Sequence, residues 1–172
     1  FSIVMGHKKA SNGFVDTKDL FFKLVSGEKD LKISGDEEKE LVFRAAIDGN
    51  RYLDFVYKIK GNSYDLGFDI RMKGLGDVIT RGKYDIVWKG EIPKTEKAME
   101  LMRQKTTMYY HYLGDDLENL NPNSPSQTEE IVTPVDWLSF RSQFFFQALI
   151  ASNENAFKNM KIAQANPVTP AE

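Results

Sequence analysis

The groups with most chemical potential in this 172-residue sequence are two histidines, 25 acidic side chains and a few glycine-rich loops. His7 lies in the polar stretch MGHKKASNG. His111 lies in the aromatic stretch MYYHYLGDD, which ends with Asp115 and Asp116, just past the end of the expected strand. A metal site needs ligands that converge at about 2 Å, and neither histidine has a familiar ligand spacing around it. We therefore expect structural or surface roles for both histidines, and no bound metal.

The acidic clusters and glycine-rich loops do not match known ligand-binding loops. GDD (114–116) and GDEEKE (35–40) lack the alternating oxygen ligands of a calcium loop, so turn roles suit them better. GLGDVITRG (74–82) lacks the Gly-Lys-Ser/Thr ending of a phosphate loop. No nucleophile elbow supports a Ser–His–Asp arrangement. A glycosidase-type pair of carboxylates stays open, because nothing singles one out. We expect no cofactor.

Composition and charge exclude several classes of protein. The formal net charge of -2 provides no basic field for a nucleic acid. The absence of Cys excludes disulfides, thiolate nucleophiles and Cys-ligated zinc. No run reaches the roughly 18 consecutive apolar residues of a transmembrane helix, and we find no signal peptide. Because the chain opens without Met and in a strand-like apolar run, we expect it to be a piece of a longer protein.

The centre of the chain alternates between apolar and polar residues. Segments 41–47, 53–59 and 64–72 each place apolar side chains on one face, and the turn signals DGN and KGNS separate them. Period two with one polar face predicts an antiparallel meander of three strands. Further strands are expected in segments 19–25, 84–88, 106–114 and 129–140, which brings the total to about eight.

One helix is predicted within EKAMELMRQ (96–104), with Thr95 as N-cap and Glu96 in the first turn. Its apolar face would carry Ala98, Leu101 and Met102. Segment 120–130 is rich in Pro, Asn and Ser and predicts an exposed loop. We expect one domain over residues 1–157 and a polar tail over residues 158–172.

The stretch VDWLSFRSQFFFQALIA (135–151) concentrates one Trp and four Phe in seventeen residues. Its alternation is poor, whereas Trp137, Phe140 and Phe144 follow a helical spacing. We expect a strand that ends near residues 137–140 and then a short amphipathic helix to about residue 150. Two interpretations stay open. The helix packs inward on the sheet, as apolar faces of this width usually do, or it contacts a membrane or a membrane protein.

The same stretch, preceded by YYHYLGDDLENL and a Pro/Ser-rich loop, resembles the large periplasmic domain of the YidC family of membrane protein insertases. The resemblance covers roughly residues 19–150. Its most specific part is a Trp, then Gln-Phe-Phe, then a Leu-Ile pair. Together with one further aromatic residue, these form the expected docking or partner-contact segment: Trp137, Phe140, Gln143, Phe144, Phe145, Leu149 and Ile150.

The resemblance implies an all-β, mainly antiparallel β-supersandwich of the galactose-mutarotase-like type, with one or two short helices near the C-terminus. Several N-terminal strands would lie outside the chain, and residues 158–172 would lead towards the next transmembrane helix. The implied function is that of a non-catalytic periplasmic domain at the inner membrane of a Gram-negative bacterium. It would assist membrane protein insertion as a scaffold, a chaperone-like surface or a Sec-contacting surface. Membrane protein clients and Sec translocon subunits would be its partners, with no small-molecule substrate.

A carbohydrate-binding or mutarotase-like β-sandwich is the alternative. It rests on the aromatic residues of the predicted strands, such as Trp88, Tyr109 and Tyr110, whose rings can stack on sugars. A mutarotase site needs a His acid and a carboxylate base in one cleft, and a shared fold does not bring that site with it. The sequence does not identify such a pair.

Overall fold

The structure is a computed structural model that describes residues 1–8, 10–26, 30–92, 97–152 and 155–166. These residues form 13 strands, one α-helix and one 3-10 helix, and all strand pairings are antiparallel. The predicted all-β, antiparallel fold is therefore confirmed. The chain divides into two compact units, Phe1–Lys89 and Gly90–Glu172, a division that the sequence patterns did not indicate.

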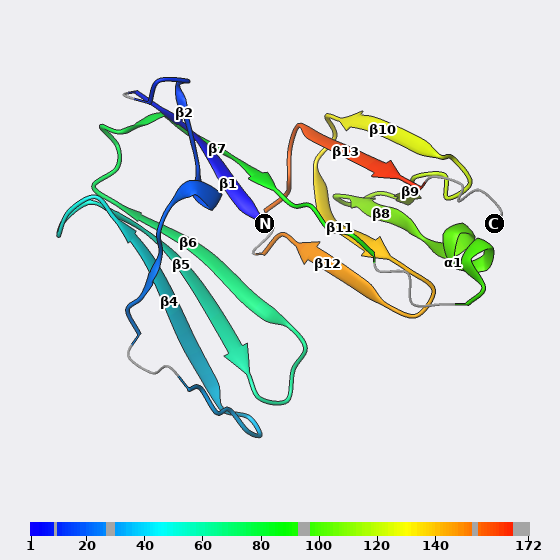
Figure 1. Ribbon diagram of the computed structural model, residues 1–172, viewed down its shortest axis with the longest axis horizontal. Helices are drawn as coiled ribbons and strands as arrows, with labels where there is room; N and C mark the ends of the chain where they lie inside the picture. The colour runs from blue at the N-terminus through cyan, green and yellow to red at the C-terminus, as the bar shows by residue number, and fades with distance from the viewer. Residues whose placement is uncertain (9, 27–29, 93–96, 153–154, 167–172) are drawn as a thin grey trace. The chain divides into compact units, whose positions relative to one another are not determined.

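Unit 1 contains two sheets, with strand orders β2-β1-β7 and β3-β4-β5-β6. The predicted meander is confirmed as β4, β5 and β6, three long neighbouring ribbons in Figure 1. The Asp48 carboxylate shapes the turn between β4 and β5, because it accepts hydrogen bonds from the backbone N–H groups of Asn50 and Arg51 at 2.9 Å each. The elements of unit 1 are β1 (Ser2–His7), β2 (Phe14–Asp16), a 3-10 helix (Thr17–Asp19), β3 (Lys23–Leu24), β4 (Glu38–Ala46), β5 (Tyr52–Lys60), β6 (Leu66–Lys73) and β7 (Ile79–Val87).

The core of unit 1 joins the apolar face of the meander to β1. Ile3 and Met5 of β1 are buried in one cluster with Leu53 and Phe55 of β5. Phe22 stacks on Phe55 with ring centroids 4.7 Å apart. Burial of these large apolar side chains is the main stabilising contribution to the unit.

Ion pairs cross the opposite face of the meander, as the predicted polar face requires. Asp54 is only 4% exposed, and it accepts two hydrogen bonds of 2.7 Å from the Arg44 guanidinium. The long charged side chains also cover the strand beneath them, so Val56 is fully buried on this polar face. The pairs are Arg44–Asp54 at 2.7 Å, Lys58–Asp69 at 2.8 Å and Arg71–Glu40 at 3.0 Å.

Unit 2 contains a four-stranded sheet, β12-β11-β8-β9, and a two-stranded sheet, β10-β13 (Figure 1). The Tyr110 hydroxyl of β8 donates a hydrogen bond of 2.9 Å to Glu129 of β10, so the Tyr110 side of the larger sheet faces the smaller sheet. We call this side the inner face; it carries Met108, Tyr110, Leu138, Phe140 and Leu149. The elements of unit 2 are α1 (Met99–Lys105), β8 (Thr107–Tyr112), β9 (Leu117–Asn119), β10 (Ser126–Ile131), β11 (Val135–Arg141), β12 (Phe146–Ile150) and β13 (Met160–Ala165).

The stretch 135–151 forms a β-hairpin, so the predicted helix that ends near residue 150 is wrong. β12 pairs with β11 along all 5 of its residues. The Ser142 backbone N–H closes the turn by donating to the Phe145 carbonyl at 2.7 Å. The two intervening residues, Gln143 and Phe144, lack the Gly or Asn that usually marks such a turn. Because the turn signal was absent, the helical spacing of the aromatic residues was the stronger pattern.

Two other strand predictions need correction. In segment 19–25 only Lys23–Leu24 is a strand. Asp19 ends the 3-10 helix Thr17–Asp19, where the Asp16 carboxylate accepts a hydrogen bond from the Lys18 backbone N–H at 3.1 Å, and residues 20–22 lie in neither a helix nor a strand. Segment 129–140 contains parts of two strands, β10 and β11, with Pro134 between them. Proline interrupts a strand ladder because it has no N–H to donate.

The C-terminal segment also differs from its prediction. Within residues 158–172, Met160–Ala165 form β13, which pairs with β10 along 6 residues and buries Ile162. Only one face of β13 is covered, so its sequence is polar enough to resemble a tail. The predicted loop over 120–130 is also shorter than expected, since Leu120 is fully buried and β10 begins at Ser126.

The helix predicted in 96–104 is confirmed as α1 over a narrower span. Met102 is buried, as predicted, whereas Leu101 is exposed. The predicted cap Thr95 and the first-turn residue Glu96 lie outside the described residues. α1 has 7 residues, and the described part of the chain holds no helix with the length and hydropathy of a membrane span.

Candidate functional site: a groove on the outer sheet face

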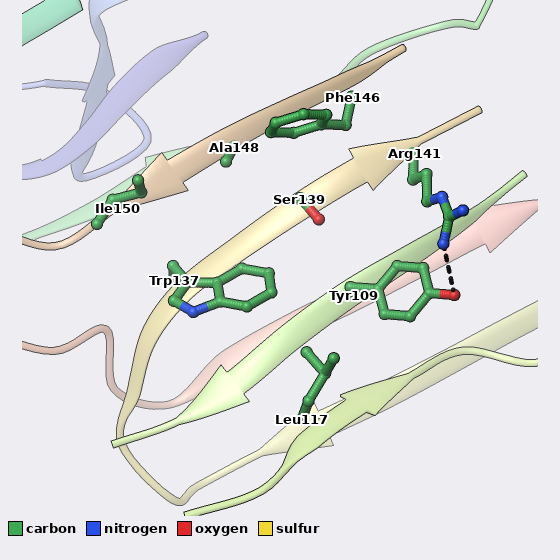
Figure 2. Close-up of a pocket in the computed structure, with 8 residues that line it drawn as sticks. All are labelled: Tyr109, Leu117, Trp137, Ser139, Arg141, Phe146, Ala148 and Ile150. Atoms are coloured by element: carbon green, nitrogen blue, oxygen red, sulfur yellow. Dashed lines mark hydrogen bonds between the residues drawn. The ribbon is translucent and has the colours of Figure 1, made fainter. Parts of the chain in front are cut away.

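A groove of about 420 Å³ lies on the side of the four-stranded sheet that points away from β10 and β13. We call this side the outer face. A volume of this size falls within the usual range for ligand pockets. The residues that line the groove are Tyr109 of β8, Leu117 of β9, Trp137, Ser139 and Arg141 of β11, and Phe146, Ala148 and Ile150 of β12 (Figure 2).

The strand register builds the groove from rows of side chains that cross the sheet. In the central row, Ser139 and Ala148 lie opposite each other and form a low floor, because both are small. Larger side chains flank this floor on both sides (Figure 2). The rows are Trp137 with Ile150, Tyr109 with Ser139 and Ala148, and Arg141 with Phe146.

Apolar side chains of the outer face are exposed. Phe146 is 73% exposed and Ile150 is 67% exposed. At the hairpin turn, Phe144 and Phe145 are 65% and 74% exposed. A sheet face in water normally carries polar side chains, and a contiguous exposed apolar patch marks an interaction site. We call the eight groove-lining residues together with Phe144 and Phe145 the hairpin surface.

Two polar arrangements border the groove. The Arg141 guanidinium lies 5.5 Å from the centroid of the Tyr109 ring and donates a hydrogen bond of 3.2 Å to its hydroxyl, the dashed line in Figure 2. Arg141 forms no ion pair with the residues that the structure describes. The His111 ring stacks on Trp137 at 5.8 Å, and its Nδ1 lies 2.8 Å from the Asp136 carboxylate. Arg141 therefore places an unpaired positive charge at one end of the groove.

The structure distributes the predicted contact residues over three places. Trp137 and Ile150 lie opposite each other on the outer face. Phe140 and Leu149 are half-buried on the inner face. The remaining three occupy the turn: Gln143, Phe144 and Phe145.

Sequence reasoning missed most of the groove. It did not single out Ser139, Arg141, Phe146 or Ala148, because they were assigned to the expected helix or to its boundary. Residues 146–150 read Phe-Gln-Ala-Leu-Ile, which alternates between apolar and polar residues only over its first three positions, so this segment offers no clear period-two signal for a strand.

In the described part of the chain no carboxylate lines the groove, so these residues provide no acid–base pair there. Among the described residues, no group of three or more His, Asp or Glu side chains is placed to hold a metal ion. His7 ends β1, where its backbone N–H donates to the Gly13 carbonyl at 2.8 Å. The absence of a metal and of a cofactor stays a prediction.

The aromatic residues behind the carbohydrate hypothesis do not form one platform. Tyr109 lies on the outer face of β8, whereas Tyr110 is buried on the inner face. Trp88 belongs to unit 1, where it follows β7. Tyr109 therefore remains as the one member of this set on the groove.

Comparisons with known proteins identify relatives of the chain. The family model described as the YidC periplasmic domain matches residues 4–170. The chain is 27% identical over 159 residues to the membrane protein insertase YidC of Porphyromonas gingivalis, covering 91% of this chain and 24% of that protein. It is 27% identical over 165 residues to the Chlorobium limicola protein of the same name, covering 90% and 28%.

The Bacteroides fragilis protein of that name is 28% identical over 144 residues, covering 83% of this chain and 22% of its own length. The chain thus spans about a quarter of the length of the curated relatives it matches. No solved structure matches the chain significantly, so the galactose-mutarotase-like classification stays a prediction. The relatives' names favour the insertase hypothesis over the carbohydrate-binding one. Because the family model matches nearly the whole chain, this protein belongs to the YidC periplasmic domain family.

Proposed function

We propose that this chain is a non-catalytic periplasmic domain of a membrane protein insertase, and that its hairpin surface contacts membrane protein clients during insertion and folding. The observation that carries the proposal is the exposure of Phe144, Phe145 and Phe146 on a hairpin whose opposite face already supplies the core of unit 2. The curated relatives, which are named membrane protein insertases, support the assignment.

The hairpin surface suits weak, repeated contacts with apolar chains. Aromatic rings bury a large area when a partner covers them, and they lose little rotamer freedom in doing so. The groove is shallow and lined mainly by apolar groups, so it can accept different side chains without a fixed pattern of hydrogen bonds. Small interfaces of this kind are typical of transient complexes.

The cellular setting is part of the proposal. The domain would lie in the periplasm, at the inner membrane of a Gram-negative bacterium, and Sec translocon subunits would be further protein partners. The family description supports the periplasmic compartment. The net charge of -2 and the apolar hairpin surface favour protein partners over nucleic acid.

The test uses the full-length insertase in proteoliposomes, with a membrane protein client made by in vitro translation. We expect Phe144→Ser combined with Phe145→Ser to lower the yield of protease-protected client, because the turn loses its apolar contact. Tyr64→Ser is the matched control, since Tyr64 is a fully exposed aromatic residue between β5 and β6 of unit 1. Equal yields for the double variant and the control, with native circular dichroism for both, would contradict the proposal.

A further inference from the structure

The outer edge of β12 is unpaired among the described residues, because β12 is the last strand of its sheet. Two backbone hydrogen bonds fix the register of its ladder with β11. The Ala151 N–H donates to the Asp136 carbonyl at 2.8 Å, and the Ser142 N–H donates to the Phe145 carbonyl at 2.7 Å. Since hydrogen-bonded pairs alternate in an antiparallel ladder, residues 147 and 149 also bond to β11. The N–H and C=O groups that point outward belong to Phe146, Ala148 and Ile150.

The side chains of the same three β12 residues line the groove. A peptide strand added to this edge would form main-chain hydrogen bonds and place alternate side chains over the groove at the same time. Ser139 and Ala148 form a low floor, so the peptide residue opposite Ala148 has room for a large apolar side chain. The position of the groove beside a free strand edge therefore favours an extended peptide.

Arg141 gives this site a preference in charge. It lies opposite Phe146 and, in the part of the chain that the structure describes, is the single charged residue that lines the groove. If the added strand runs antiparallel to β12, the residue two positions after the one opposite Ala148 comes to lie beside Phe146, in the row that Phe146 forms with Arg141 of β11. The guanidinium is directed toward Tyr109 of β8, so it acts on that position across Phe146 as a nearby charge. It would attract a carboxylate there and repel an ammonium group.

We propose that the β12 edge binds an extended segment of a membrane protein client by strand addition, with a large apolar side chain opposite Ala148 and an acidic residue beside Phe146, in the row of Arg141. The identity of the client rests on the proposed function. Segments that cross to the periplasm carry fewer Lys and Arg residues than cytoplasmic loops. Such segments suit a groove whose lining charge is positive.

A defined peptide tests the mode of binding to the 172-residue chain. The probe is fluorescein-labelled Thr-Val-Thr-Leu-Thr-Glu-Thr with a C-terminal amide, and the readout is fluorescence anisotropy. N-methylation of Leu removes the donor opposite Ala148, and we expect binding to weaken about tenfold. N-methylation of the next Thr, whose N–H points away from β12, should leave affinity unchanged. Equal affinities for the two methylated peptides would overturn strand addition.

A charge exchange tests the role of Arg141. Arg141→Glu should weaken binding of the peptide that contains Glu and strengthen binding of its counterpart with Lys at that position. Lys158→Glu is the matched control, because it makes the same change of charge at an exposed position of unit 2 outside the groove. The charge preference would be overturned if Arg141→Glu and the control showed the same ratio of affinities for the Glu peptide and the Lys peptide.

Residue-resolved hydrogen exchange distinguishes other occupants of the edge. Without a client, the amides of Phe146, Ala148 and Ile150 should exchange rapidly in the full-length insertase, and the peptide should slow them. Slow exchange without peptide would show that another part of the insertase, or a second copy, covers β12, and would overturn the proposal. That result would leave the proposed function standing, because the insertion assay tests the Phe144–Phe145 turn.

Discussion

Ala148 lies directly opposite Ser139 on the neighbouring strand, and this pair of small residues forms the floor of the groove. The side chains on both sides of the pair are large, so the depth of the groove depends on these two positions. Ala148 is exposed, and its side chain can therefore be enlarged without disturbing the core on the inner face.

Ala148→Leu should fill the groove and leave the fold intact. We expect weaker binding of the anionic dye 8-anilinonaphthalene-1-sulfonate, because the dye loses both the apolar floor and its approach to Arg141. Fluorescence titration of the dye measures this effect. Ala163→Leu is the control, since it adds the same side chain at an exposed position of β13. A dye affinity that Ala148→Leu does not reduce would show that the groove is not a binding surface.

The turn and the inner face should differ strongly in their contribution to stability. Phe144→Ala combined with Phe145→Ala should change the free energy of unfolding by less than about 0.5 kcal/mol, because both rings are mostly exposed. Leu138→Ala, a buried site in the same hairpin, should cost about 2–5 kcal/mol. Urea denaturation compares the two variants. A loss of about 3–5 kcal/mol in the Phe double variant would place these rings in a core.

Tyr110 should link the stability of unit 2 to alkaline pH. Burial, and secondarily the hydrogen bond to the Glu129 carboxylate, raise the pKa of Tyr110 above the ordinary tyrosine value of 10.0. A raised pKa in the folded state means that the stabilising contribution is complete below about pH 10 and is lost as the pH rises through the folded-state pKa.

Tyr110→Phe should therefore be less stable than the wild type at pH 7 by about 1–2 kcal/mol, since Glu129 loses the Tyr110 donor and keeps only the one from Gln127 among those described. Above pH 10 the difference between the two proteins should shrink, because the wild type alone loses the contribution of Tyr110. Urea denaturation between pH 7 and pH 11 measures the stability difference at neutral pH and its decrease at alkaline pH. A difference in stability that stays constant over this pH range would contradict a raised pKa of Tyr110 in the folded state.

Local patterns in the sequence predict part of this fold. β4, β5 and β6 follow from period-two alternation and from turns that contain Gly and Asn. The β11–β12 hairpin does not follow from such patterns, because its turn consists of Gln143 and Phe144 and contains neither Gly nor Asn. β13 was missed because Met160 and Ile162 are its only large apolar residues, on the one face that packs inward.

The candidate site was predicted only in part for a similar reason. The sequence indicated the correct stretch, through Trp137 and Ile150, but it placed Trp137 near the end of a strand and Ile150 at the end of a helix. Tyr109 joins the groove from β8, about thirty residues earlier in the chain, through the register between β8 and β11. A pairing of that kind depends on long-range contacts, and the period of a local segment does not reveal it.

Site-specific photocrosslinking in cells would show whether the outer face of the hairpin contacts membrane protein clients. p-Benzoyl-phenylalanine would replace either Phe146 or Gln147 in the full-length insertase. These neighbouring residues are both exposed, but they point to opposite faces of β12. We expect adducts with newly made membrane proteins from position 146 and few from position 147. Equal adducts from both positions, or adducts from position 147 alone, would contradict a contact through the outer face.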